Sequence, residues 1–133
     1  MKTPILIAAA LLLDAQGRAL LVRKRGTVFF MQPGGKIEPH EQPVQALARE
    51  LEEELGVRIQ PEQAVYLGRS SAPAANEPGH EVRCELFRVV IDHAVEPAAE
   101  IEEAVWVSAE QAYELNLAPL THHWVLPSFF VQA

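Results

Sequence analysis

The sequence predicts one α/β domain in which strands dominate and a single strong helix lies in the middle of the chain. Its 133 residues suit one domain with a packed core and are too few for two. The apolar content of 49% fits a globular protein. Apolar runs typical of strands lie on both sides of the helix, without the regular strand–helix alternation of a doubly wound sheet. We therefore expect residues 1–133 to form a single domain built on a sheet.

The chain begins with two apolar runs, Ile5–Leu13 and Ala19–Val22, separated by an Asp-Ala-Gln-Gly turn. This pattern predicts a β-hairpin. Lys2 and the first run also have the charge and apolar core of a signal peptide, but Asp14 interrupts the place of a small-residue cleavage site. We expect the hairpin, followed by a short strand over Val28–Gln32.

The central helix is predicted to begin at Pro43 and to end at Gly56. Proline suits the first turn, where its missing N–H is no loss, and glycine suits the left-handed position that closes a helix. Apolar residues recur at the spacing of one helical face; they are Val44, Leu47, Ala48, Leu51 and Leu55.

The second half of the chain is predicted to hold three further strands, over residues 64–71, 80–91 and 100–107. Ser108, with Gln111 three residues later, is typical of a capping box and predicts a short helix. A last helix is expected over residues 120–131, opened by Pro119 and interrupted near Pro127.

Charge and cysteine content exclude several classes of protein. The formal net charge of −7 argues against a nucleic-acid polymer as the main partner. No apolar stretch has the length of a membrane span. Cys84 is the only cysteine, so the chain forms no internal disulfide and suits a reducing compartment such as the cytoplasm. The alternation of Val82, Cys84 and Leu86 indicates a buried thiol.

The polar side of the central helix carries three carboxylates, Glu50, Glu53 and Glu54, at i, i+3 and i+4. Neighbouring anions on one helical face repel each other by a few tenths of a kcal/mol per pair, roughly. A hard cation removes this repulsion, since Mg²⁺ prefers carboxylate oxygens and keeps waters for a phosphate ligand. The alternative is an ordinary solvated acidic face.

More fixed positions accompany these carboxylates. Counting from Gly35, the chain follows the pattern G-x5-E-x7-R-E-U-x-E-E-x-G-U, where U is bulky and apolar, and it ends at Val57. In all nine specified positions the sequence resembles the Nudix hydrolase family. The resemblance implies an α/β/α sandwich on a mixed sheet, with this box forming a loop–helix–loop. It also implies Mg²⁺-dependent cleavage, with Mn²⁺ a possible substitute, of a nucleoside diphosphate linked to another group.

The resemblance also implies roles for individual residues. Glu53 and Glu54 are expected to be the principal metal ligands, and Glu50 a ligand or the general base. The carbonyl of Gly35 is expected to complete the ligand set, and Arg49 with Glu41 to orient it as an ion pair. Residues expected to act from outside this set are Glu100, as metal ligand or base, and Lys36, as a substrate-binding cation. Glu102 and Glu103 could be confused with Glu100.

Arg23 lies in the densest positive run of this acidic chain, Arg-Lys-Arg-Gly. It is either a clamp for a substrate phosphate, to which arginine offers a planar fork, or a charge that keeps an edge strand soluble. If this run does bind a phosphate, Arg23 is the best single candidate, because family members often carry an arginine there that contacts the substrate. His40 departs from the family, in which glycine is usual before Glu41.

The resemblance narrows the substrate only to a small nucleoside diphosphate derivative. The protein is expected to be a monomer or a homodimer. The position of Pro73 is associated with family members that cleave ADP-ribose. Leu117 occupies the place of a base-reading asparagine in members that cleave 8-oxo-dGTP, which argues against that activity.

Two other functions stay open. One is a non-catalytic nucleotide-binding Nudix module, although such modules often lose a ligand glutamate and this box has lost none. The other is a plain acidic interaction domain, which predicts no metal dependence.

Overall fold

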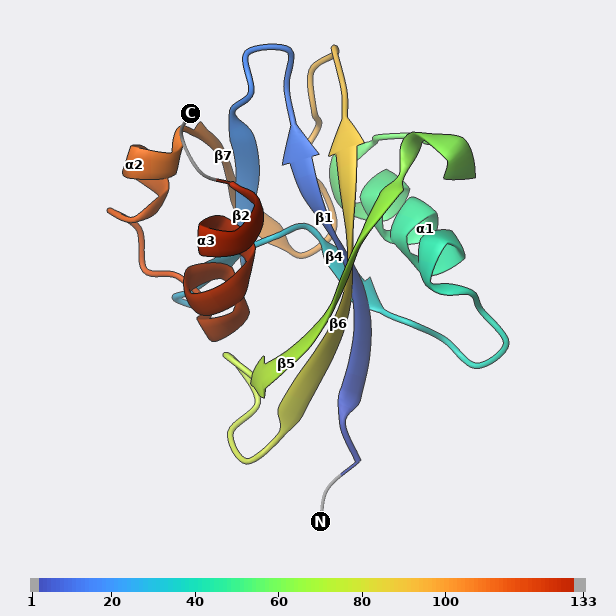
Figure 1. Cartoon of the computed structure of the whole chain (residues 1–133), viewed down its shortest axis with the longest axis vertical. Coiled ribbons are helices and arrows are strands. Elements are labelled where there is room, and N and C mark those ends of the chain that lie inside the picture. The colour runs from blue at the N-terminus through green and yellow to red at the C-terminus, as the bar shows by residue number, and fades with distance from the viewer. Residues whose placement is uncertain (1–2, 131–133) are drawn as a thin grey trace.

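The computed structural model describes residues 3–130 and contains one mixed sheet with helices on both sides (Figure 1). The strands are β1 (Ile5–Leu13), β2 (Ala19–Lys24), β3 (Phe30–Met31), β4 (Gly34–Lys36), β5 (Val65–Pro73), β6 (Glu81–Val90) and β7 (Ile101–Val107). The helical segments are α1 (Pro43–Leu55), the 3₁₀ turn η1 (Pro61–Gln63), α2 (Ala109–Ala112), the π-helical turn η2 (Thr121–Val125) and α3 (Leu126–Phe129). The predicted α/β class, with strands dominant, is confirmed.

Strand β1 is the centre of the sheet. It pairs antiparallel with β2 and β4 and parallel with β6, and the strand order is β3-β2-β1-β6-β5, with β7 on β2. The predicted hairpin is present, with Leu13 opposite Ala19. Its turn is held by Asp14, whose carboxylate accepts hydrogen bonds from the backbone N–H groups of Gln16 and Arg18 at 2.9 and 2.8 Å.

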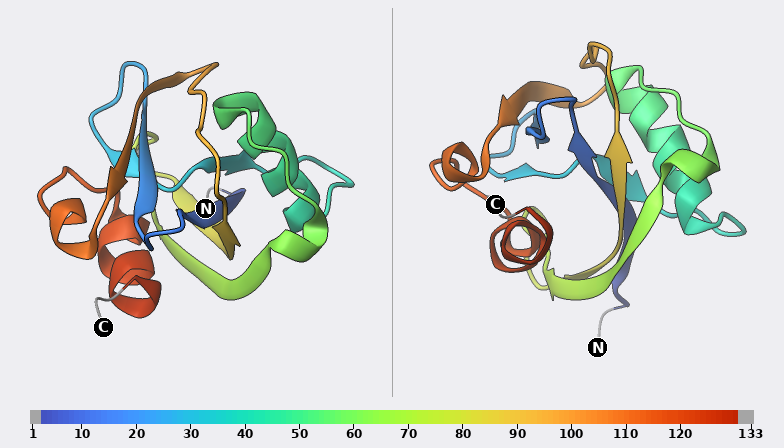
Figure 2. Two further views of the ribbon diagram at one scale, coloured as in Figure 1. Left: turned by 90° about the horizontal axis from the view of Figure 1, so that it is seen from above. Right: turned by 45° about the horizontal axis from the view of Figure 1, so that its top comes forward.

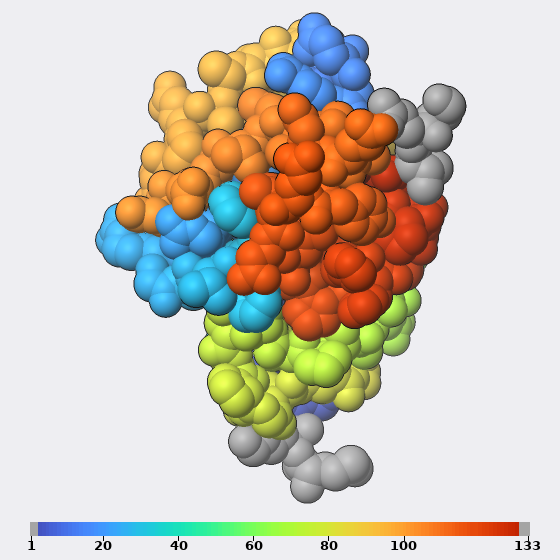
Figure 3. Space-filling view, turned by 90° about the vertical axis from the view of Figure 1, so that its left-hand side faces the viewer, coloured from blue at the N-terminus to red at the C-terminus, as the bar shows by residue number. Residues whose placement is uncertain are grey.

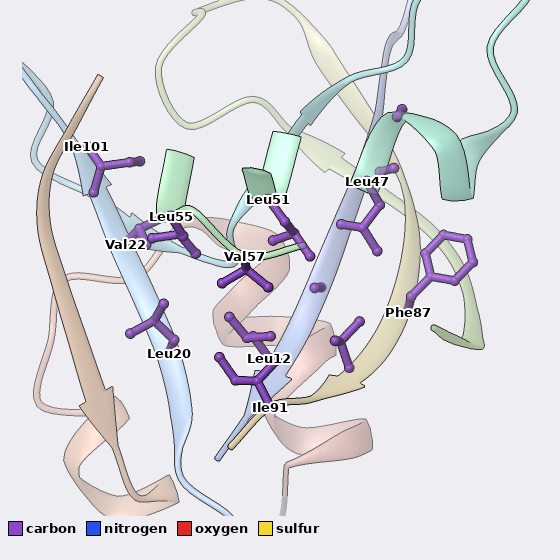
Figure 4. Close-up of a cluster of buried hydrophobic side chains, with 14 residues drawn as sticks. Leu12, Leu20, Val22, Leu47, Leu51, Leu55, Val57, Phe87, Ile91 and Ile101 are labelled. Carbon is purple, nitrogen blue, oxygen red and sulfur yellow. The ribbon is translucent and has the colours of Figure 1, made fainter. Parts of the chain in front are cut away.

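Helix α1 packs its apolar side on one face of the sheet, as Figure 4 shows. Leu47, Leu51 and Leu55 are fully buried, and each such side chain stabilises the fold by about 1.5–3 kcal/mol relative to exposure. Their partners from the sheet are the even-numbered residues Ala8, Ala10, Leu12, Leu20 and Val22. The helix ends as predicted, because Gly56 has a φ of 67° and its N–H donates to the carbonyl of Glu52.

The opposite face of the sheet is covered by the C-terminal helices. Odd-numbered residues of β1 and β2, among them Leu11 and Leu21, pack toward the segment that carries Leu120, Val125 and Leu126. Figure 2 shows α1 and α3 on opposite sides of the sheet. Figure 3 shows the covering segment, in orange and red, from outside. The α/β/α layering implied by the family resemblance is therefore present.

Cys84 lies in β6 within this second core, with 2% of its surface exposed. Burial raises the pKa of its thiol to about 12. The predicted buried thiol is confirmed.

One predicted strand is shorter in the structure, and the last helix can be compared as far as residue 130. The strand expected over 28–32 is reduced to Phe30–Met31, because Val28 is 63% exposed and lies outside the strand pairing with β2. The last helix is irregular near Pro127, as predicted, because the π turn over Thr121–Val125 gives way to the α-helical turn of α3 next to this proline. The expected helix end at residue 131 lies outside the described residues. No helix within residues 3–130 is long and apolar enough to cross a membrane.

Candidate metal and phosphate site

The site begins where the Gly-Gly pair of β4 passes between β1 and α1. A Cβ atom on Gly34 would lie 2.2 Å from the carbonyl oxygen of Ala8, so any side chain would collide with β1. A Cβ atom on Gly35 would lie 2.4 Å from the carboxyl carbon of Glu50. Only glycine at both positions lets the backbone lie directly against this carboxylate.

Arg49 connects the loop to the helix. Its guanidinium donates to both carboxylate oxygens of Glu41, at 2.8 and 2.9 Å, and to the carbonyl of Lys36 at 3.0 Å. A fourth hydrogen bond, at 2.8 Å, reaches Oε1 of Glu50. The Arg49 hydrogen bonds hold the pKa of Glu41 down to about 2, and Glu41 in turn raises the pKa of Arg49. The predicted Arg49–Glu41 pair is present, and it orients Glu50 as well.

Glu54 is the most deeply buried carboxylate of the helix, with 5% of its surface exposed. Burial, and then the nearby charge of Glu50, raises its pKa to about 8. Lys24 and the N–H of Gly34, which donates to Oε1 at 3.3 Å, act in the opposite direction. A buried carboxylate beside a second one is expensive to ionise unless a cation lies between them.

A cavity of about 480 Å³ opens beside these groups. It brings together six of the residues predicted from sequence, which are Gly35, Lys36, Glu50, Glu53, Glu54 and Glu100. Arg49 and Glu41 do not line it and lie behind Glu50, as their hydrogen bonds require. Glu52 points elsewhere on the helix and lies 3.5 Å from Arg58. The acidic helix thus presents three carboxylates to the cavity and keeps the fourth outside it.

Among the three acidic residues near the start of β7, only Glu100 lines the cavity. Glu102 lies 3.6 Å from Arg25, and Glu103 lies 2.6 Å from Arg23. The backbone fixes Glu100 there, because its carbonyl accepts a hydrogen bond from the N–H of Arg25 at 2.7 Å.

Two loops that carry site residues contain backbone in the left-handed region. His40, just before Glu41, has a φ of 70°, and Ala99, just before Glu100, has a φ of 54°. A non-glycine residue pays about 1–2 kcal/mol for this conformation. At His40 the cost arises because histidine replaces the glycine usual in the family. Each of the two strained residues directly precedes an acidic residue of the site, Glu41 or Glu100.

The basic run at the end of β2 divides between two environments. Arg23 lies away from the cavity and donates hydrogen bonds to Glu103 and to the carbonyl of Thr27, both at 2.8 Å. Lys24 lines the cavity and is close enough to Glu54 to lower its pKa. Neighbouring residues of a strand point to opposite faces of the sheet, and Lys24 lies on the same face as Leu20 and Val22, toward α1. The pairing of β2 with β7 shifts register between Arg23 and Lys24. The structure favours Lys24 for the role that the sequence suggests for Arg23, and the Arg23 assignment stays a prediction.

Comparison with known proteins agrees with this geometry. The NUDIX domain family model matches residues 3–129, almost the whole chain. The chain belongs to the NUDIX domain family. The Nudix box is therefore the segment from Gly35 to Val57, and the fold and the box were both predictable from sequence.

Individual relatives place the chain within this family. The protein named CTP pyrophosphohydrolase from Escherichia coli K12 is 37% identical over 87 residues, which are 65% of this chain and 60% of that protein. The chain thus spans less than two thirds of this relative. The solution structure of the E. coli ORF135 protein is 28% identical, with a TM-score of 0.71, covering 95% of this chain and 92% of that one. The E. coli dihydroneopterin triphosphate pyrophosphohydrolase, at 18% identity, shares the fold with a TM-score of 0.78 over 99% of this chain and all of that one.

The donors at the Nudix box suit a hard divalent cation. They are carboxylates and a backbone carbonyl, the oxygen ligands that Mg²⁺ and Mn²⁺ prefer. As arranged in residues 3–130, no three His, Cys, Asp or Glu side chains stand close enough together to ligate one ion. Glu50 lines the cavity, and Arg49 takes up only one of its two carboxylate oxygens, Oε1. The buried Glu54 and its raised pKa are the observation that favours a cation here.

Several residues that line the cavity were not predicted from the sequence. Asn76 and Glu77 come from the loop between β5 and β6, and Thr27 follows β2. Glu77 lies 3.7 Å from Lys36, so this loop already contacts the Nudix box through opposite charges. A loop residue acquires such a role from the folded path of the chain, and its neighbours in sequence do not reveal it.

Proposed function

We propose that this Nudix domain is a Mg²⁺-dependent hydrolase that cleaves the pyrophosphate bond of a nucleoside diphosphate linked to another group. The observation that carries the proposal is the buried Glu54 next to Glu50, at a cavity that also presents Lys24 and Lys36. The carboxylates would bind a metal ion, and the lysine side chains would bind phosphate oxygens. A nucleotide pyrophosphate with its metal ion supplies both the positive charge for the carboxylates and the negative charge for the lysines.

The roles of the acidic residues follow from their positions. Glu53, Glu54 and the carbonyl of Gly35 would hold the metal ion, and Glu50 is either a further ligand or the general base. Bound Mg²⁺ would neutralise the phosphate oxygens, orient them and promote ionisation of the attacking water. Arg49 holds Glu50 in place through a hydrogen bond to Oε1, and a base must be held within reach of the water that it deprotonates. Glu100 lines the same cavity and is the alternative base.

The cationic residues would bind the substrate. Lys24 and Lys36 would contact phosphate oxygens and offset the negative charge that the Nudix box gathers around the reacting bond. The name of the E. coli relative, CTP pyrophosphohydrolase, supports a nucleotide substrate. We further propose that the protein acts in the cytoplasm as a monomer or homodimer.

A substrate screen tests the proposal. Purified protein would be incubated with nucleoside triphosphates, nucleotide sugars and ADP-ribose in Mg²⁺ or Mn²⁺, and the nucleoside monophosphate released from each would be measured by chromatography. We expect turnover of at least one substrate and its loss in EDTA. Binding without turnover at any metal concentration would instead support the non-catalytic module. Full activity in EDTA would contradict the metal assignment.

A pair of variants tests which basic side chain, Lys24 or Arg23, contacts the substrate phosphate. Lys24→Ala is expected to lower kcat/KM by about tenfold to a hundredfold, which is the worth of a charge-assisted hydrogen bond of roughly 1.5–3 kcal/mol. Arg23→Ala removes an equal charge from the adjacent residue and is expected to stay within about threefold of wild type, because Arg23 pairs with Glu103. Both are to be measured at saturating Mg²⁺. A larger loss for Arg23→Ala would return the phosphate contact to Arg23.

A further inference from the structure

Among the described residues that line the cavity beside the Nudix box, Glu77 is the acidic residue that comes from neither the box nor the segment before β7. It lies in the loop between β5 and β6. The ends of this loop are held by the pairing of Pro73 with Glu81 and by a hydrogen bond from the N–H of Ala74 to the carbonyl of His80 at 2.9 Å. The N–H of His80 donates in turn to the carbonyl of Glu77 at 3.1 Å. These contacts fix the backbone of Glu77 at the cavity.

The carboxylate of Glu77 lies near Lys36, which is expected to bind the substrate. Oε1 of Glu77 and Nζ of Lys36 are 3.7 Å apart, and the two side chains are 46% and 68% exposed. An exposed ion pair of this kind adds little to the stability of a fold. Its larger effect is on the site, because Glu77 offsets the positive charge that Lys36 offers to a phosphate oxygen.

The charges around the cavity make this offset important. Its lining has three basic residues, Lys24, Arg25 and Lys36, against five glutamates. A bound divalent cation would neutralise the carboxylates of the Nudix box, because they would ligate it directly. Glu77 is paired with Lys36 instead, so its charge stays next to the position expected for phosphate oxygens and repels them.

We propose that Glu77 selects substrates by their charge: it disfavours each additional phosphate in the cavity, so it penalises a nucleoside triphosphate more than a nucleoside diphosphate linked to an uncharged sugar. This inference rests on the proposed function, since it assumes that phosphate groups of the substrate bind beside Lys36. A terminal phosphate brings about 1.5–2 negative charges toward Glu77. A sugar brings hydroxyl groups, which can donate hydrogen bonds to a carboxylate.

The test compares ADP-ribose, ADP and ATP, which share a nucleoside and carry successively more negative charge. Glu77→Gln keeps the size of the side chain and removes its charge. With Mg²⁺, the variant is expected to raise kcat/KM on ATP about threefold to tenfold and on ADP-ribose less than twofold, with ADP between them. The gain should appear in KM with kcat retained, because the repulsion acts equally on the ground and transition states. It should shrink in about 0.5 M salt, which screens exposed charges.

Glu81→Gln is the matched control. Glu81 lies at the end of the same loop, its side chain is 50% exposed, and it does not line the cavity. This variant should match wild type on all three nucleotides. Equal effects of Glu77→Gln and Glu81→Gln would mean that the total charge of the protein matters and the position of Glu77 does not, which would overturn the inference.

A binding measurement separates this inference from the hydrolase proposal. Calorimetry with the α,β-methylene analogues of ADP and ATP, in Mg²⁺, reports selection by charge without turnover. Tighter binding of the ATP analogue by Glu77→Gln, with a smaller change for the ADP analogue, would support the inference even if no nucleotide is hydrolysed. If Glu77→Gln hydrolyses ATP and ADP-ribose in the same ratio as wild type, the inference is wrong while the hydrolase proposal stands.

Discussion

Glu53→Gln is expected to lower kcat by about a hundredfold or more, whereas Glu52→Gln leaves kcat within twofold of wild type. The two residues are adjacent in α1, and their side chains are exposed to a similar extent, 57% and 54%. Only Glu53 lines the cavity; Glu52 lies beside Arg58 on another side of the helix. The pair therefore separates the loss of a metal ligand from the general loss of one negative charge.

The measurement is kcat as a function of Mg²⁺ concentration for both variants, with the melting temperature of each. Exposed glutamates contribute little to stability, so neither melting temperature should change by more than a few degrees in EDTA. The activity of Glu53→Gln should require more Mg²⁺ as well as reach a lower maximum. Equal losses of kcat in the two variants would mean that the acidic face of α1 is not divided as the structure indicates.

Glu54→Gln is expected to stabilise the metal-free protein above neutral pH and to abolish its stabilisation by Mg²⁺. The pKa of Glu54 is raised from 4.5 to about 8 in the folded state, so the folded protein holds a proton that the unfolded chain releases. Stability from this group is complete below pH about 4.5 and is lost as the pH rises toward 8. The free energy of unfolding then falls by at most about 1.4 kcal/mol per pH unit, and glutamine removes that dependence.

The experiment is urea unfolding of wild type and Glu54→Gln in EDTA at pH 5.5 and pH 8, repeated with Mg²⁺. The stability advantage of the variant should be larger at pH 8. Mg²⁺ should stabilise wild type by RT ln(1 + [L]/Kd), about 2.7 kcal/mol at a hundred times Kd, and the variant far less. Glu53→Gln serves as the control for pH dependence, because its carboxylate is exposed. Parallel pH profiles for wild type and Glu54→Gln would contradict the buried, protonated Glu54.

The Nudix box was predictable because its determinants are local. Pro43 and Gly56 set the ends of α1, and helical spacing alone puts Glu50, Glu53 and Glu54 on one face. The pairing of Arg49 with Glu41 follows from the loop that joins them and from the complementary shapes of the two groups. None of these features needs knowledge of the distant sheet.

The choice between Arg23 and Lys24 was not predictable, because both faces of β2 are covered. Residues 19–22 are all buried, so their hydrophobicity does not alternate and gives no indication of which side meets α1. The contacts that separate Arg23 from Lys24 depend on pairing with β7, some eighty residues later in the chain.

The central position of β1 also constrains the order in which this protein can fold. Its parallel partner β6 pairs Ile5 with Val82, so one edge of β1 stays uncovered during synthesis until β6 has been made. Helix α1 can form early from local contacts, but it has no complete sheet on which to bury Leu47 and Leu51 until β6 arrives. The acidic helix is thus synthesised well before the later segments that complete the cavity around its carboxylates. Throughout that interval a nascent chain would expose the apolar residues of β1.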